Sequence, residues 1–297
     1  SLGIIVNAIF IVIDFYFLSI STREKGMSDN SNYAAMSMAL AAQYFVYRII
    51  KNRFAIFNLS NLFYLAVIGY LFFAVLATGS RTGFILFVFS AGLLIMLLTN
   101  WATKLRLIPF AIVVGGFVVL NSGIIELTEK SATFNRLTTA TEDVRVPLFK
   151  AGMNALEDSW YMGIGIAQMI DGKTFAKYIA PVDPVFLAEV ESRGKGLGLH
   201  NLYLEVAVEA GMIGLITFLT WLFFIFKHQV TMLRYKPRQG EHTLLLILFI
   251  AVLITGLTGK GLLGALFWMM YTLSSKYYIE TEYDLSNPEN PVRIKKH

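Results

Sequence analysis

The sequence has no cysteine among its 297 residues and few charged side chains. The absence of cysteine excludes disulfide bonds, a thiolate nucleophile and cysteine-ligated metal sites. Charged residues make up 15% of the chain, compared with about 25% in an average soluble domain. Hydrophobic residues make up 56%. This composition argues against a soluble domain and indicates a protein that lies in a membrane.

Several motifs that bind nucleotides or metals are also missing. There is no G-x-x-x-x-G-K-[ST] loop, no H-E-x-x-H pair and no G-x-S-x-G nucleophile turn. No two aspartates stand two positions apart, so the D-x-D metal site of many nucleotide-sugar transferases is absent as well. We therefore expect no metal ion, no nucleotide and no other cofactor, and no nucleic acid partner.

Apolar residues occur in blocks separated by charged loops. A perpendicular helix needs about 20 such residues to cross the bilayer core, and the shorter blocks reach that length by including flanking residues. The sequence therefore predicts an all-α, polytopic transmembrane helical bundle with a long, partly helical external loop. The eight expected spans are Leu2–Ile20, Tyr33–Ile50, Leu62–Ala77, Gly83–Leu98, Leu107–Asn121, Leu202–Phe226, Leu244–Thr258 and Leu262–Tyr278.

The basic residues predict the orientation, because lysine and arginine in short loops stay on the cytoplasmic side. Thirteen of them fall in one set of alternate connections and the C-terminal tail, and four in the opposite short connections. We therefore expect residues 1–121 to form five transmembrane helices, 122–199 an external loop that carries any catalysis, 200–278 three further transmembrane helices, and 279–297 a cytoplasmic tail. Because the chain begins at Ser1, directly ahead of a span, we expect it to be part of a longer protein.

One stretch of the long loop has helical periodicity. Pro147 suits the first turn of a helix, and the residues after it separate into an apolar and a polar face. Trp160 and Tyr161 then suit the headgroup level of a membrane. The expected apolar face contains Leu148, Gly152, Ala155 and Leu156, and the polar face contains Lys150, Asn154, Glu157 and Asp158.

Polar residues gather where the loop enters the sixth span. His200 is the only histidine on the predicted outer side, and Asn201, Glu205 and Glu209 follow it at intervals of four residues, which places them on one helix face. Carboxylates within a membrane are functional candidates. A polar helix start with glutamates turned toward neighbouring helices would also explain the pattern. We favour a functional role for His200 because it is isolated, and because histidine is the side chain type best suited to proton transfer near neutral pH.

Several basic residues on the same side could bind an anion. Arg81 stands in the short turn Gly79–Gly83, Arg136 and Arg145 stand in the long loop, and Lys260 stands in a glycine-rich connection. A guanidinium group stays charged and binds phosphate through paired donors. Each residue taken alone is more simply a solvated or snorkelling side chain, except Arg81, which is confined between glycines.

Four segments resemble the O-antigen ligase and polymerase superfamily of bacterial surface-glycan enzymes. Their order and spacing fit the family over most of the chain, and the histidine–asparagine pair after a long outer loop is the most specific part. The segments are Gly26–Ala35; Ser80–Gly83; Arg145 with Ala151–Leu156 and Tyr161–Gly165; and Leu199–Glu205 continuing to Glu209–Gly214.

The resemblance implies a metal- and nucleotide-independent glycosyltransferase in the bacterial inner membrane, with its long loop in the periplasm. Its donor would be an undecaprenyl-pyrophosphate-linked glycan, and its acceptor a glycolipid, a glycan or a protein. By this similarity His200 would take the proton of the acceptor hydroxyl, while Arg81 and Arg145 would bind the pyrophosphate. Lesser substrate-binding candidates are Arg136, Lys260, Asn201 and Glu205.

Other functions stay open from the sequence. A polysaccharide polymerase or a protein O-oligosaccharyltransferase of the same superfamily would use the same donor and the same residues, and would differ in the acceptor. A polysaccharide transporter would also carry charges within the membrane, but would not need a helical outer loop with arginines and one histidine.

Overall fold

The computed structural model describes residues 2–13, 30–54, 58–105, 145–233, 239–257, 283–284 and 292–293. The predicted spans Leu107–Asn121 and Leu262–Tyr278 lie outside these residues, as do the candidate site residues Arg136 and Lys260 and most of the expected tail. The eight-span count and the tail therefore stay predictions.

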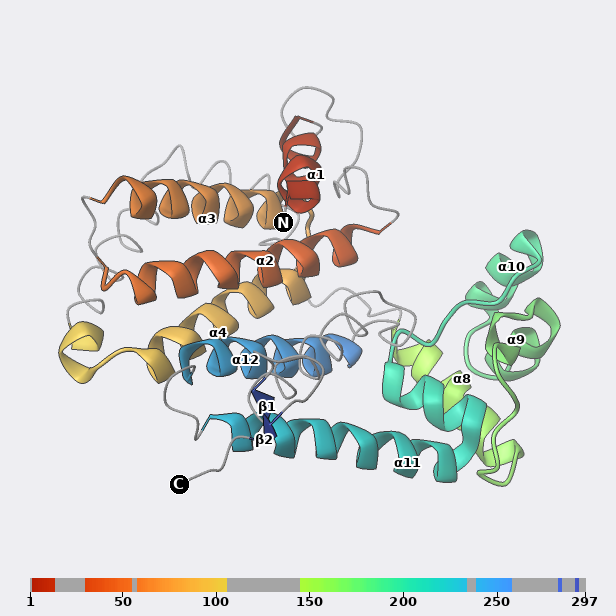
Figure 1. Ribbon diagram of the computed structural model, residues 1–297. Coiled ribbons are helices and arrows are strands. Elements are labelled where there is room, and N and C mark those ends of the chain that lie inside the picture. The colour runs from red at the N-terminus through yellow and green to blue at the C-terminus, as the bar shows by residue number, and fades with distance from the viewer. Residues whose placement is uncertain are drawn as a thin grey trace. The chain divides into compact units, whose positions relative to one another are not determined.

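The chain forms two compact units. Unit 1 comprises Ser1–Thr141 and Pro237–Ala251, and unit 2 comprises Glu142–Lys236 and Val252–His297. Unit 1 contains α1 (Leu2–Ile13), α2 (Ser31–Lys51), α3 (Leu59–Ala77), α4 (Arg81–Leu98) and most of α12 (Gln239–Gly256) (Figure 1). Unit 2 contains α8 (Arg145–Asp158), the 3-10 turn η2 (Gln168–Ile170), α9 (Gly172–Ile179), α10 (Pro184–Arg193), α11 (Leu202–Met232), the end of α12, and the short antiparallel strands β1 (Tyr283–Asp284) and β2 (Val292–Arg293).

Four of the described helices, α3, α4, α11 and α12, are long and apolar enough to cross a membrane. They correspond to four of the predicted spans, so the prediction of an all-α polytopic membrane protein is confirmed. The described part of α1 is apolar but shorter. The 21-residue α2 is not among the four helices; it carries Gln43, Arg48 and Lys51 among its residues. Its predicted role as a span stays a prediction.

In unit 1, α2 packs against both α3 and α4. The side chain of Asn30 caps α2 by accepting a hydrogen bond of 2.8 Å from the backbone N–H of Asn32. Small residues on α2, among them the buried Ala35 and Ala39, let the neighbouring helices approach closely, as is common in membrane bundles. A Cβ added at Gly83 of α4 would collide with the Cβ of Ala35, so the start of α4 rests directly on α2.

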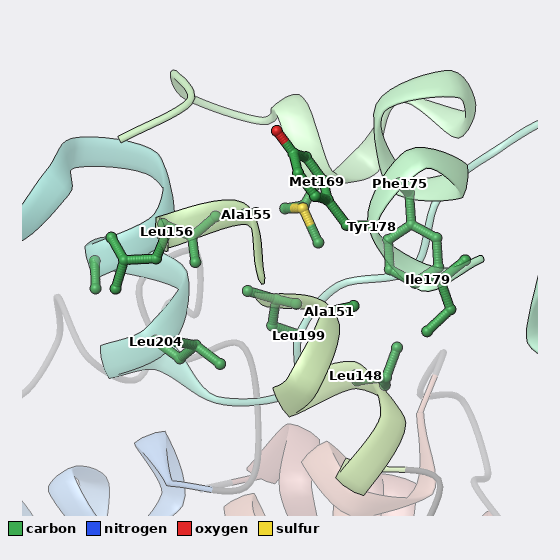
Figure 2. Packing of buried hydrophobic residues seen from close by; sticks show 12 residues of the cluster. Leu148, Ala151, Ala155, Leu156, Met169, Phe175, Tyr178, Ile179, Leu199 and Leu204 are labelled. Atoms are coloured by element: carbon green, nitrogen blue, oxygen red, sulfur yellow. The ribbon is translucent and has the colours of Figure 1, made fainter. Parts of the chain in front are cut away.

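Unit 2 has its own hydrophobic cluster, shown in Figure 2. α8 contributes its apolar face, on which Leu148, Ala155 and Leu156 are buried, while Lys150 and Asp158 on the opposite face are exposed. The predicted amphipathic helix is therefore confirmed. The other helices that fill the cluster are α9, α10 and the first turns of α11. The remaining buried members are Ala151, Met169, Phe175, Tyr178, Ile179, Leu199, Leu204, Ala207 and Val208.

Candidate functional site

The segment before α11 has an unusual backbone. His200 adopts a left-handed conformation with φ of 53°, which is uncommon for a residue other than glycine. Asn201 follows as the N-cap of α11, and its side-chain oxygen accepts a hydrogen bond of 3.0 Å from the N–H of Leu204. The buried side chains of Leu199 and Leu202 hold the turn on both sides. Packing therefore fixes the partly exposed His200 at the start of this helix.

The turn is also anchored to α8. A Cβ added at Gly152 would lie 2.8 Å from Cδ2 of Leu204 and 3.0 Å from Cδ1 of Leu199. A side chain at this position would have to displace the ends of these two leucines, so α8 and the histidine segment pack closely here. Arg145 is the first residue of α8 and is partly exposed. Unit 2 thus joins the helix that carries Arg145 to the turn that carries His200.

The helix α11 is broken at Gly211, where φ is 73° and ψ is −178°. The backbone of Tyr161–Gly165 fits into this break. Ile164 N–H donates to the carbonyl of Val208 at 2.8 Å, and Met212 N–H donates to the carbonyl of Tyr161 at 2.9 Å. Two of the segments that carry the family resemblance therefore form one structural unit.

The carboxylates of the predicted polar stripe have different surroundings. Glu209 lies beside the break, and its Oε1 accepts a hydrogen bond of 2.9 Å from the N–H of Ala167. This bond gives Glu209 a structural partner in the loop after Tyr161–Gly165. Glu205 lies one turn after the cap and is partly buried, and its N–H donates to the carbonyl of Asn201 at 2.9 Å.

Arg81 begins α4 in unit 1. The turn before it is rigid, because the hydroxyl of the buried Thr78 donates to the carbonyl of Val75 at 2.6 Å and accepts from the N–H of Ser80 at 3.2 Å. The buried side chain of Ser80 caps α4 by accepting from the N–H of Gly83 at 3.2 Å. The backbone that carries Arg81 is therefore held in place, and the Arg81 side chain is partly exposed.

An exposed polar clamp joins the end of α8 to α9. The carboxylate of Asp158 accepts hydrogen bonds from Lys177 Nζ at 2.5 Å and from the Tyr178 hydroxyl at 3.0 Å. The bond from Lys177, followed by that from Tyr178, lowers the pKa of Asp158 below its ordinary value. The same contact with Asp158 raises the pKa of Lys177.

The sequence Ala167–Thr174 reads A-x-x-x-x-G-K-T, which is close to a phosphate-binding loop. The structure argues against that function. The side chain of Asp171 caps α9 by accepting hydrogen bonds of 2.9 Å from both the N–H and the hydroxyl of Thr174, which lower the pKa of Asp171. The helix terminus where a phosphate would bind already holds a carboxylate of the chain itself.

Sequence reasoning missed the break at Gly211 and its pairing with the loop from Tyr161. The available signal was the recurrence of glycine at 163, 165, 211 and 214 in otherwise apolar segments. Among the described residues, no three histidine, aspartate or glutamate side chains gather as a metal site.

Comparison with known proteins gives one family. No curated protein matches the chain. The family model described as O-antigen ligase matches residues 65–219, just over half of the chain. This range contains the Ser80–Gly83 turn, α8, the turn at His200 and the break at Gly211. The chain therefore belongs to the O-antigen ligase family, whose members are membrane enzymes of the glycan ligase or polymerase type.

Proposed function

We propose that this protein is a glycosyltransferase that moves a glycan from undecaprenyl pyrophosphate to an acceptor hydroxyl. The reaction would take place on the periplasmic face of the bacterial inner membrane, to which we assign residues 122–199 as the external catalytic loop. The acceptor oxygen forms a bond with the anomeric carbon, and the bond from that carbon to the pyrophosphate oxygen breaks. Undecaprenyl pyrophosphate leaves, and the anomeric centre is inverted.

The observation that carries the proposal is the placement of His200, in left-handed backbone at the capped start of α11 and beside the packing of Leu199 on α8. Strained backbone persists only where the surrounding structure enforces it, and it occurs preferentially at functional sites. His200, with φ of 53°, stands between the cap at Asn201 and Leu199, which packs close to Gly152. An imidazole with a pKa near neutrality accepts the acceptor proton efficiently, and such a base contributes about 10²–10⁴-fold to the rate.

The leaving pyrophosphate needs stabilisation as its charge develops. Arg145 supports this role because α8, which it begins, packs on the His200 turn. We assign the same role to Arg81 on the basis of the family resemblance. Removing one such charge-stabilising donor costs about 10²–10³-fold in turnover. Neither arginine needs a metal ion to bind the phosphate oxygens.

A transfer assay in detergent tests the proposal, with lipid-linked glycan as donor and lipid A–core, a free repeat unit or a serine-containing protein as acceptor. A covalent product without any membrane gradient is the expected result. A transporter would yield no product. The acceptor that is consumed distinguishes a ligase from a polymerase or a protein O-oligosaccharyltransferase.

Two substitutions at His200 separate catalysis from folding. His200→Ala should lower the transfer rate at least about 100-fold. His200→Gly should be equally inactive, yet melt at or above the wild-type temperature, because glycine accepts a left-handed backbone without strain. Either variant retaining more than about a tenth of the rate would contradict the role of His200 as the base.

A further inference from the structure

Unit 2 has a pocket of about 370 Å³ on one side of α8. It is lined by Phe149, Lys150, Met153 and Asn154 of α8 and by Pro181 and Val182 of the turn between α9 and α10. This volume falls within the range of about 300–1,000 Å³ that is usual for small-molecule sites. We call these six residues the α8 pocket.

The lining chemistry fits a sugar ring. Phe149, of which 48% is exposed, offers an aromatic surface, and Pro181 and Val182 add further apolar surface. Asn154 offers both a donor and an acceptor, and Lys150 offers a cationic donor. A pyranose has one face of C–H groups and a rim of hydroxyl groups. Its C–H face can therefore pack on the aromatic ring of Phe149 while its hydroxyl groups form hydrogen bonds with the side-chain amide of Asn154. The absence of any carboxylate from the lining disfavours a metal ion as occupant.

The polar groups of the α8 pocket are available to a ligand. Within the part of the chain that the structure describes, the side chains of Lys150 and Asn154 form neither a hydrogen bond nor an ion pair. Asn154 is partly buried and Lys150 is exposed. A hydroxyl-rich ligand would therefore gain hydrogen bonds here without breaking any within the protein.

The walls of the α8 pocket are fixed before a ligand arrives. The clamp of Asp158 with Lys177 and Tyr178 holds α9 against α8. Val182 N–H donates to the carbonyl of Ile179 at 2.9 Å, which ties the pocket turn to the hydrophobic cluster. A preformed site loses little conformational entropy when it binds.

Part of the α8 pocket lies on the same face of α8 as Arg145. Residues 145, 149 and 153 are spaced by four, so they lie along one stripe of α8, and adjacent members are about one turn of 5.4 Å apart. We propose that the α8 pocket binds a sugar of the donor glycan beyond the pyrophosphate, with Phe149 under the ring and Asn154 bonded to its hydroxyls. This inference rests on the proposed function, in which Arg145 holds the pyrophosphate.

A labelling experiment tests the α8 pocket without requiring any transfer. Since the chain has no cysteine, Lys150→Cys and Glu157→Cys each introduce a single thiol on an exposed position of α8. The probe is the glycan released from its lipid by mild acid, added at millimolar concentration before a water-soluble maleimide. The glycan should slow labelling of Lys150→Cys at least fivefold and leave that of the control, Glu157→Cys, within twofold. Equal rates with and without glycan at Lys150→Cys, or equal slowing at both positions, would overturn the proposal.

Donor length supplies a second test. Asn154→Ala and Phe149→Ala should raise the KM for the full-length lipid-linked donor about fivefold, close to the loss of one hydrogen bond or one ring contact. The KM for a donor that carries only its first sugar, and kcat for both donors, should stay within twofold, because uniform binding energy affects KM alone. Glu157→Ala is the matched control. If the KM rose equally for both donors, these residues would act on pyrophosphate binding or on folding. If the KM for the full-length donor did not rise, the subsite would be refuted. Failure of the wild type to transfer either donor would instead refute the proposed function, and the labelling result would still decide the pocket.

Discussion

Gly211 allows a direct test of the structure, because alanine there is disfavoured for two independent reasons. The backbone at φ 73° and ψ −178° belongs to a region that is essentially restricted to glycine. In addition, a Cβ at this position would lie 2.5 Å from the carbonyl oxygen of Met162 and 2.8 Å from that of Tyr161. Both neighbours are backbone atoms, so no side-chain rotation can relieve the collision.

These two effects give the expected magnitude for Gly211→Ala. The backbone conformation costs an alanine about 1–3 kcal/mol. Displacing the Tyr161 segment also weakens its 2.9 Å hydrogen bond from Met212, which is worth about 0.5–1.5 kcal/mol. The free energy of unfolding should therefore fall by about 2–4 kcal/mol, which corresponds to a decrease in melting temperature on the order of 5–10 °C for a chain of this size.

Thermal unfolding in detergent, followed by the loss of monodisperse protein, measures this effect. The control is Gly92→Ala on α4, where an added Cβ meets nothing within 4 Å. Alanine is favoured over glycine within a helix by about 0.5–1 kcal/mol, so this control should melt at or above the wild-type temperature. If Gly211→Ala melted within about one degree of the wild type, the break in α11 and its pairing with Tyr161 would be wrong.

Three further predictions concern charge. Arg81→Lys and Arg145→Lys should give turnover at saturating acceptor between that of the wild type and that of the alanine variants, because lysine lacks paired donors. A chelator should change the rate of no variant, and activity that is lost on chelation and restored by Mg²⁺ would refute the metal-free mechanism. A reporter after Lys104 should read cytoplasmic, and a tag at Gly172 should react with an impermeant external label; protection of Gly172 would refute the orientation. Finally, the lowered pKa of Asp158 means that its contribution to stability is present above its ordinary value of 3.8 and is lost as the pH falls through the lower folded value. The melting temperatures of Asp158→Asn and wild type should therefore differ at neutral pH and converge in acid, and a constant difference would exclude the clamp.

The helices that could be predicted from the sequence are those specified by local apolar runs. α3 and α4 begin and end within three residues of the predicted spans Leu62–Ala77 and Gly83–Leu98. α11 begins at the predicted Leu202 but continues to Met232, beyond the expected end at Phe226. Neither glycine nor proline occurs between Phe226 and Met232, so nothing local ends the helix where its residues become polar.

The break in α11 could not be predicted in the same way, because it depends on contacts between segments far apart in the sequence. Gly211 alone would be tolerated in a continuous apolar helix at a cost of about 1 kcal/mol. The left-handed backbone of His200 is equally hidden, and its neighbour Leu199 packs close to Gly152, nearly fifty residues earlier. The candidate residue His200 could be chosen from its type and position, whereas its conformation required the structure.

The structure also changes how the polar residues of α11 are interpreted. On the sequence, Glu205 and Glu209 look equivalent, because both lie on the stripe that starts at Asn201. The bond from Ala167 N–H gives Glu209 a place in the joint between the loop and the broken helix. Removing this carboxylate should therefore act through stability, as we expect for Gly211→Ala. His200 lies in the turn before α11, and its left-handed backbone is uncommon for a residue other than glycine. Positive φ also occurs at Arg53, Phe54, Trp160, Tyr161 and Ala167. We therefore assign the base to His200, and not to the neighbouring glutamates, on the basis of its imidazole side chain, its fixed place at the start of α11 and the family resemblance.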